Sequence, residues 1–257
     1  MLELIPREKL EHVARKVLKY PLHDAEKDYI LTVVMQIVAS SDLSEILVFK
    51  GGTSIHHCYL EQMRFSEDLD FTSKKKDISL NDIKDLFTEY DIFEIKKEYE
   101  SKPSLKIERL KYSGILDTPN SIKFEVDRLQ SVVMPTVQMQ YKNVWGLNFS
   151  VNVMNSVEIC AEKVRACNDR FRYRDFYDLY MMANKLGLNI ENSIKLIPKK
   201  EIRKTINKQN LLRNLELSLN EVSEKGDTVV YSESVQVVEL RNFFKSMKLS
   251  SYEPNVD

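Results

Sequence analysis

The stretch Leu47–Phe71 constrains this chain most, because a buried strand, a glycine turn and two acidic residues follow one another within it. Four consecutive apolar residues at 46–49 predict a short buried strand. Two glycines in the turn that follows let the backbone approach a ligand closely. Beyond the turn we expect a helical segment and then a second strand that ends near Ser73. The turn residues are Lys50, Gly51, Gly52, Thr53 and Ser54.

Asp68 and Asp70 lie on the second predicted strand of this stretch. Residues two apart on a strand point to the same face, roughly 6–7 Å apart along the chain. We therefore expect the two carboxylates to project together, with Leu69 and Phe71 facing the core. Like charges on one face repel each other unless a cation lies between them. The pattern predicts a metal site, whereas the alternative, two solvated charges on an edge strand, leaves the glycine turn without a purpose.

A further acidic strand is expected within residues 92–130, where three runs alternate apolar and polar side chains. The turn signal at 117–120 separates the last two runs, so we expect those strands to pair as a hairpin. On the last strand, Glu125 and Asp127 share a face. Glu125 lies between two apolar residues, as expected on a central strand, while Asp127 precedes an arginine and is the alternative third carboxylate.

The combination of a glycine turn, an Asp-x-Asp strand and a later acidic strand indicates metal-dependent nucleotidyl transfer. Main-chain N–H groups at such a turn bind a triphosphate, and the following helix start adds a partial positive charge. Carboxylates in such sites hold two divalent cations about 3.5–4 Å apart. Hard oxygen ligands suit Mg²⁺. Each element alone is a weak signal, and their order and spacing make the combination more specific.

The rest of the chain is predicted to be mainly helical. Ser79, with Asp82 three residues later, marks the start of one helix. We expect an N-terminal domain over residues 1–150, with 132–150 as a looser passage, and a mostly helical domain over 151–257. Residues 229–240 favour either a short hairpin or an extended segment. The expected helices are 6–20, 24–39, 79–90, 156–170 and 175–186, followed by helical structure to about 225.

The charge distribution is uneven although the net charge is only −1. Residues 142–214 contain fourteen Lys and Arg against seven Asp and Glu, which gives +7 and leaves −8 for the remainder. A polyanionic partner and a solvated helical face explain this equally well. No apolar run is long enough to span a membrane, and the charged N-terminus is unlike a signal peptide. With three cysteines at no metal-ligand spacing, we expect a cytoplasmic protein with reduced thiols.

Two motifs resemble those of one known family. KGGTSIHHCYLEQMRFSEDLDF, at 50–71, resembles the first signature of the AbiEii/AbiGii-type nucleotidyltransferase toxins, a branch of the DNA polymerase β-like superfamily. EICAEKVRACNDRFRYRDFYDLYMM, at 158–182, resembles the second. The likeness covers roughly residues 45–185. The matching residues are Lys50, Gly51, Gly52, Thr53, Arg64, Ser66, Asp68, Asp70, Phe71, Glu162, Lys163, Arg170, Arg174, Asp175, Asp178 and Leu179.

The resemblance implies a mixed α/β nucleotidyltransferase fold, with a small mixed sheet flanked by helices and a C-terminal helical domain. It implies transfer of a nucleoside monophosphate from an NTP to an acceptor hydroxyl, with Mg²⁺ as cofactor. It further implies the toxin of a type IV toxin–antitoxin or abortive-infection pair, with an antitoxin as protein partner. In related toxins tRNA serves as acceptor, so tRNA or another RNA is an expected partner.

The resemblance also implies roles for individual residues. Asp68, Asp70 and Glu125 become metal ligands, and Lys163 becomes the cation that neutralises phosphate charge. Asp175 orients Lys163 or the acceptor, with Asp178 as the alternative. The triphosphate contacts are Lys50, Gly51, Gly52, Thr53, Ser54 and Ser66.

Other interpretations stay open for the same residues. Arg174, Asp175 and Asp178 are also compatible with a buried ion-pair network that joins two helices, and Lys163 with a solvated helix position. His56 and His57 are predicted to be surface or packing residues rather than ligands. A small-molecule nucleotidyltransferase of the drug-modifying type would use the same carboxylates. A catalytically silent regulator would keep the fold alone.

Overall fold

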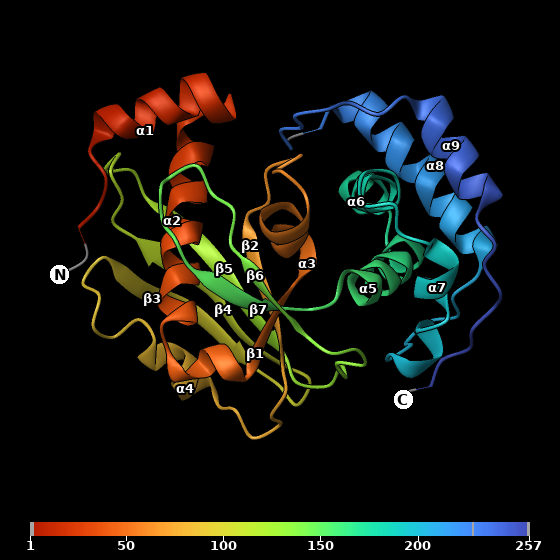
Figure 1. The fold of residues 1–257 in the computed structure, drawn as a ribbon, viewed down its shortest axis with the longest axis horizontal. Coiled ribbons are helices and arrows are strands. Elements are labelled where there is room, and N and C mark those ends of the chain that lie inside the picture. Colours follow the sequence, from red (N-terminus) through yellow and green to blue (C-terminus); the bar gives the residue numbers. More distant parts are fainter. Residues whose placement is uncertain (1–2, 228, 256–257) are drawn as a thin grey trace. The chain divides into compact units, whose positions relative to one another are not determined.

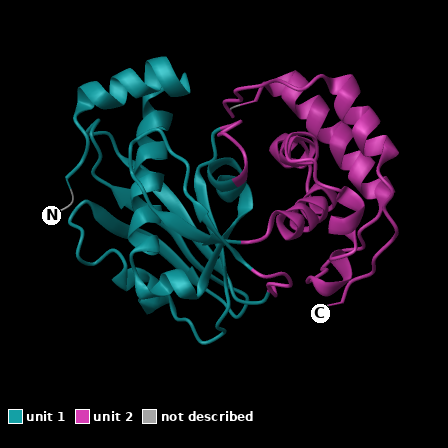
Figure 2. Ribbon diagram, viewed as in Figure 1, with its two compact units in different colours: residues 1–58, 65–129, 136–153 teal, residues 59–64, 130–135, 154–257 magenta. Residues whose placement is uncertain are grey.

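The computed structural model describes residues 3–227 and 229–255. The described chain divides into two compact units, which are coloured separately in Figure 2. The first contains the chain up to residue 58 together with 65–129 and 136–153. The second contains 59–64, 130–135 and the chain from 154 onward. Two short segments that fall between strands in the sequence therefore belong to the second unit.

The first unit is built on a sheet that, within the described residues, has seven strands in the order β3-β4-β5-β2-β1-β7-β6 (Figure 1). β2 pairs in parallel with β5, and β1 with β7, while the other neighbours are antiparallel, so the sheet is mixed. The expected hairpin is confirmed as the β4–β5 pair. The strands are β1 Leu47–Lys50, β2 Asp68–Ser73, β3 Phe93–Glu100, β4 Ser104–Tyr112, β5 Asn120–Asp127, β6 Val137–Gln140 and β7 Ser150–Val153.

The prediction of a loose passage over 132–150 was wrong for β6 and for the first residue of β7. Each of these strands has only four residues, too few for alternation to stand out from the surrounding loops. Their pairing is set by the rest of the sheet, because β7 pairs with β1 at Phe49 and β6 pairs with β7.

Helices accompany the sheet in this unit. α1 (Arg7–Val13) continues into a π-helical turn (Ala14–Leu18), and α2 (Leu22–Ala39) lies across one face of the sheet (Figure 1). α3 (Gly51–Ser54) follows β1 directly and continues into a second π-helical turn, Ile55–Tyr59. α4 (Leu80–Asp85) begins at a capping box between Ser79 and Asp82, as expected.

The alternation of β2 and β5 separates an aromatic core from a charged face. Leu69 and Phe71 are buried, as predicted, and the Phe71 ring stacks on Phe124 of β5 with centroids 4.7 Å apart. Phe49 of β1 lies 5.4 Å from Phe71 on the same side. Because side chains alternate along a strand, Asp68, Asp70 and Glu125 project to the opposite face of the sheet.

His56 and His57 are packing residues in the structure, at 0% and 1% exposure, so the surface alternative is wrong. The Nδ1 atom of His57 lies 2.9 Å from the Lys142 carbonyl oxygen, and its Nε2 atom lies 3.6 Å from an oxygen of Asp28. Trp145 donates to the other Asp28 oxygen at 2.8 Å. These contacts fix the start of α2 and the segment before β7 against the turn that follows α3.

The second unit is helical over most of its described length. α5 and α6 contact each other, and Leu211, Leu215 and Leu219 are buried on one face of α8. Residues 200–207 interrupt the expected helical run to 225. The helices are α5 Ser156–Asp169, α6 Tyr173–Lys185, α7 Ile190–Ile194, a 3₁₀ turn Ile197–Lys199, α8 Lys208–Lys225 and α9 Val237–Ser246.

The expectation of a hairpin or extended segment over 229–240 was wrong from Val237 onward, where α9 begins. Its first residues are valines, which favour strands by composition. The buried positions are Leu240 and Phe244, four residues apart, so one helical face packs inward while Val238 stays exposed. Among residues 3–227 and 229–255, no helix combines the length and apolarity needed to cross a membrane.

Candidate active site

The charged face of the sheet carries one row of side chains across five strands. Lys50 pairs with Asp70, Asp70 with Glu125, Glu125 with Lys106 and Lys106 with Tyr99. Residues paired directly across strands share a face and lie close together. Asp68 belongs to the adjacent row, opposite Lys123. The fold thus brings together the three carboxylates predicted from the sequence and adds lysines on both sides.

The glycine turn packs directly against Asp70. Gly51 has a φ of +78°, and a Cβ atom there would lie 2.5 Å from Oδ2 of Asp70. Any other residue would be strained by the backbone conformation and would also collide with the carboxylate. The structure thus explains Gly51 by its contact with Asp70, and the predicted approach of the turn to a ligand stays a prediction.

Hydroxyl groups of the turn hold its shape. Thr53 donates to the carbonyl oxygen of Asp68 and lies 3.0 Å from the Ser66 hydroxyl, and Ser54 donates to the carbonyl of Gly51. Both Thr53 and Ser54 are buried. The hydroxyls of Thr53 and Ser54 are engaged in hydrogen bonds within the protein. A triphosphate at the turn would therefore contact main-chain N–H groups rather than these hydroxyls.

Burial and like charges raise the pKa of Asp70 to about 6, with Asp68 and Glu125 as the neighbouring charges and Lys123 and Lys50 opposing them. Lys50 also lies 3.5 Å from Asp127. A divalent cation beside Asp70 would offset the repulsion that raises its pKa.

Glu125 has a different environment, because lysines contact both of its oxygens. Lys106 lies 3.0 Å from Oε1 and Lys123 lies 2.8 Å from Oε2, and the Ser104 hydroxyl donates to Oε1 at 3.2 Å. Burial raises the pKa of Glu125, but the hydrogen bonds from Lys123 and Lys106 outweigh it, so the pKa is lowered. Glu125 stays ionised at neutral pH.

The donor set fits a hard divalent cation. Asp68 and Asp70 offer carboxylate oxygens on one face, and Mg²⁺ is usually held by one or two carboxylates together with substrate phosphates. In the part of the chain that the structure describes, no three His, Cys, Asp or Glu side chains are arranged around a common ion position. Two carboxylates with phosphate oxygens are therefore the arrangement that this geometry supports.

The remaining predicted site residues lie in the second unit, in a buried ion-pair network. Lys163 of α5 lies 2.9 Å from Asp175 and 2.6 Å from Asp178, which are three residues apart on α6. Arg64 contacts both oxygens of Asp178 at 2.7 Å, and Arg170 donates to Asp175 at 2.7 Å. The network has the predicted aspartates, but its arginines are Arg64 and Arg170.

Each charge in this network stabilises the others. Burial raises the pKa of Asp175, but Lys163 and Arg170 outweigh it and hold that pKa well below its usual range. Burial lowers the pKa of Lys163, but Asp175 and Asp178 outweigh it and raise that pKa. Lys163 is 7% exposed, so it is not a solvated helix residue.

Sequence reasoning missed Arg64, Arg170, Lys106 and Lys123 as partners of these groups. Both arginines matched the family motifs, but nothing in their spacing indicated which carboxylate each would meet. Lys123 precedes Glu125 by two residues and so shares its face, which was a usable signal. Lys106 required the register of β4 against β5.

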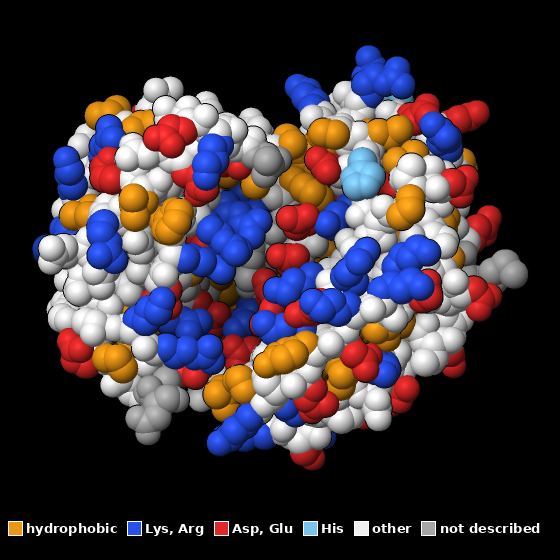
Figure 3. Space-filling model, turned by 180° about the vertical axis from the view of Figure 1, so that it is seen from behind, with side chains coloured by type: hydrophobic (Ala, Val, Ile, Leu, Met, Phe, Trp, Pro, Cys, Tyr) orange, Lys and Arg blue, Asp and Glu red, His pale blue; other side chains and the backbone are white. Residues whose placement is uncertain are grey.

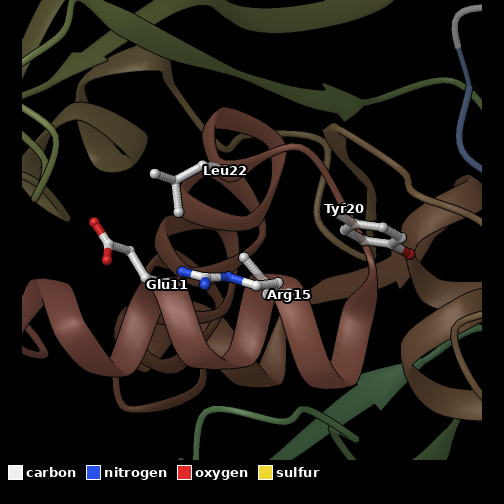
Figure 4. Close-up of a pocket in the computed structure, with 5 residues that line it drawn as sticks. Glu11, Arg15, Tyr20 and Leu22 are labelled. Carbon is white, nitrogen blue, oxygen red and sulfur yellow. The ribbon is translucent and has the colours of Figure 1, made fainter.

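A separate depression lies in the first unit beside α1 and the start of α2. Its walls come from Glu11, Ala14, Arg15, Tyr20 and Leu22 (Figure 4). Glu11 accepts a hydrogen bond from Arg7 at 2.9 Å. The lining includes none of the residues predicted for catalysis, so we assign this depression no part in the reaction.

Comparison with solved structures identifies the fold. The chain is similar to MenT4, a nucleotidyltransferase toxin from Mycobacterium tuberculosis H37Rv, with a TM-score of 0.69, 17% identity, and coverage of 95% of this chain and 91% of that one. It is also similar to an H. pylori protein assigned as a nucleotidyltransferase, with a TM-score of 0.54, 19% identity, and coverage of 86% and 94%. No curated protein matches the chain significantly. These similarities show that the chain shares the fold of these two proteins.

A family profile described as nucleotidyl transferase AbiEii toxin, type IV TA system, matches residues 34–240. The chain belongs to this AbiEii family of nucleotidyltransferase toxins. The match extends beyond the region of the two motifs and confirms the resemblance. The mixed sheet flanked by helices confirms the α/β fold expected from it. Membership implies an NTP substrate and an antitoxin partner.

Replacing Gly51 with Ala tests the close approach of the turn to Asp70. We expect a loss of more than about 2 kcal/mol in the free energy of unfolding, because a strained φ costs about 1 kcal/mol and the collision with Asp70 adds to it. Gly146→Ala is the matched control, since Gly146 has a φ of +86° in the same unit with nothing near its Cβ position. Equal losses in denaturant titrations of the two variants would contradict the close approach.

Replacing Asp70 with Asn tests the charge repulsion on the same face. Above pH 6 the folded protein must ionise a group whose pKa is raised, whereas below the unfolded value of 3.8 both states are protonated. We expect the variant to gain about 1–3 kcal/mol of stability at pH 8, and to lose that gain as the pH falls from 6 towards 4. Asp91→Asn, at an exposed carboxylate, is the control. A gain that is independent of pH would argue against the repulsion.

Replacing Lys163 with Ala tests the buried network of the second unit. The change removes one shared cation from Asp175 and Asp178, so we expect a loss of about 3 kcal/mol in unfolding free energy. Arg241→Ala, which removes the exposed Arg241–Glu216 pair, should cost far less stability than Lys163→Ala. A similar cost for both variants, measured by denaturant titration, would mean that the network does not stabilise the unit.

Proposed function

We propose that this nucleotidyltransferase toxin transfers a nucleoside monophosphate to an RNA hydroxyl, with Asp68 and Asp70 as ligands of Mg²⁺. The observation that carries the proposal is the row of side chains in which Asp70 lies between the glycine turn and Glu125. A bound divalent cation would supply charge neutralisation at the phosphates and activation of the attacking oxygen. The acceptor oxygen forms a bond to the α-phosphorus, the bond from that phosphorus to the bridging oxygen breaks, and pyrophosphate leaves with the electron pair.

The glycine turn supplies the triphosphate side of this site. Gly51 and Gly52 present backbone without side chains, and Lys50 adds a positive charge at the end of β1. Thr53, Ser54 and Ser66 are proposed to support triphosphate binding at this turn. The Thr53 hydroxyl donates to the Asp68 carbonyl and the Ser54 hydroxyl donates to the Gly51 carbonyl, and these bonds keep the main chain in position. Triphosphate binding therefore depends on turn geometry.

Glu125 is our choice for the third carboxylate, because it pairs directly with Asp70 across the β2–β5 ladder. Asp127 pairs with Thr72 instead, accepts from the Leu129 N–H and lies beside Lys50. An ionised Glu125 is suited to accept the proton of the acceptor hydroxyl or to complete the ligands of the cation.

Lys163 and Asp175 are proposed as the functional pair of the second unit. The Lys163 ammonium is the cation assigned to phosphate, and Asp175 orients it through the 2.9 Å hydrogen bond. Asp178 is favoured for a positioning role, because Arg64 takes both of its oxygens.

The proposal of an RNA acceptor, with tRNA as the expected molecule, rests on the basic stretch 142–214. Several of its cations are taken by carboxylates, Lys163, Arg170 and Lys200 among them. Figure 3 shows Lys and Arg side chains gathered in patches on one face, with acidic side chains between them. Phosphate contacts by the remaining cations would make RNA binding salt-dependent.

The test incubates the protein with each labelled NTP, Mg²⁺ and total RNA, and follows label on RNA and release of pyrophosphate. We expect Asp70→Asn to lower the rate by at least about 100-fold, while Asp91→Asn keeps the full rate. Wild-type binding to RNA should weaken steeply between 50 and 200 mM salt, as expected for several phosphate contacts.

Two outcomes would overturn parts of this proposal. Label transfer to a small molecule with a flat salt response would replace RNA by a small acceptor. Absence of transfer to any acceptor with any NTP, in protein shown to be folded, would contradict the proposed reaction.

A further inference from the structure

The two lysines that contact Glu125, Lys106 and Lys123, have no part in the function proposed above. Lys106 faces Glu125 directly from β4, and Lys123 precedes it by two residues on β5. Together they cover both of its oxygens, at 3.0 and 2.8 Å. Their side chains are 26% and 37% exposed, so both lysines are partly open to solvent.

These contacts leave the charged face unprepared for a metal ion on its own. A metal ion that binds before the nucleotide would contact Asp68 and Asp70. Glu125 is held by two lysines, whose positive charges would repel the metal ion. In the described residues, no three potential ligands surround one ion position. Two lysine ammonium groups lie on the same face as the carboxylates, where they could bind phosphates.

We propose that Lys106 and Lys123 are positioning residues that make metal binding depend on the nucleotide. Without nucleotide they hold Glu125, and when an NTP binds they move to its phosphates, so that Glu125 becomes available to the metal ion. This inference rests on the proposed function of the same face. It predicts that metal and NTP bind with strong mutual coupling rather than independently.

The chemistry of lysine suits such an exchange of partners. Its ammonium is a compact charge on a flexible four-carbon stem, so it moves between acceptors without a fixed planar geometry. A triphosphate carries several negative charges, whereas Glu125 carries one, so the phosphates are the stronger partner. A purely structural ion pair would gain nothing from partial exposure, because exposed pairs contribute little to stability.

The test measures binding by calorimetry in three experiments: Mn²⁺ alone, Mn²⁺ with a non-hydrolysable NTP analogue, and the analogue alone in chelator. For the wild type we expect Mn²⁺ affinity to rise about 10- to 100-fold when the analogue is present. In Lys106→Gln/Lys123→Gln we expect Mn²⁺ alone to bind about 10-fold more tightly and the analogue alone about 10-fold more weakly. The coupling between the two ligands should shrink accordingly.

The matched control is Lys84→Gln/Lys97→Gln, which removes two surface ion pairs to Glu98 and Glu108 elsewhere in the same unit. This control should bind both ligands as the wild type does. In the double variant, partner exchange predicts tighter binding of Mn²⁺ alone and weaker binding of the analogue alone. A structural role of the lysines would instead weaken the binding of both ligands. Circular dichroism checks folding, and the single variants should show the same signs at smaller size if the double variant is unstable.

Three results would overturn the inference. Equal Mn²⁺ affinity with and without the analogue in the wild type would show that no coupling exists, while leaving the proposed reaction intact. Weaker binding of both ligands by the double variant would show that the lysines serve structure alone. Failure of the wild type to bind either ligand would reject the inference together with the proposed function.

Discussion

The contact between Gly51 and Asp70 is the constraint on which the charged face depends. A backbone at positive φ lies where a Cβ would be 2.5 Å from a carboxylate oxygen. That contact ties the end of β1 to the middle of β2, and β2 in turn sets Glu125 opposite Asp70. The protein thereby holds a carboxylate whose pKa is raised to about 6, an arrangement that costs stability and that binding of a cation would relieve. Such local cost is typical of functional sites.

In the second unit, the buried carboxylates are balanced by cations of the protein. Lys163, Arg64 and Arg170 pair with Asp175 and Asp178, so both aspartates are neutralised by cations of the protein itself. Buried ion pairs contribute little more to stability than an apolar core would. Removing one partner is costly, however, because it leaves the other charge buried and unpaired, so the geometry of the network is fixed. Lys163 is therefore both held in place by its neighbours and needed by them. On the charged face of the first unit, by contrast, Lys123 and Lys50 offset only part of the repulsion at Asp70.

Much of this was predictable from local patterns. The alternation of Leu69, Asp70 and Phe71 gave the orientation of β2, and Ser79 with Asp82 marked the start of α4. The predictions failed where tertiary pairing decides: β6 and β7 are too short to carry a pattern, and the valines that open α9 favour strands by composition although Leu240 and Phe244 pack as a helix. The contact of Lys106 with Glu125 depends on strand register, and the contact of Arg64 with Asp178 joins residues 114 apart in the sequence, so spacing alone encodes neither.

We propose that Asp68 and Asp70 hold a divalent cation while the turn at Gly51 binds the phosphates of an NTP. Crystals grown with Mn²⁺ and a non-hydrolysable NTP analogue would test it most directly, because the anomalous signal of manganese locates the ion without reference to a fitted ligand. We expect an anomalous peak between the two carboxylates, with analogue phosphates against the main chain of Gly51 and Gly52. A manganese peak elsewhere, or a nucleotide bound away from this turn, would contradict it.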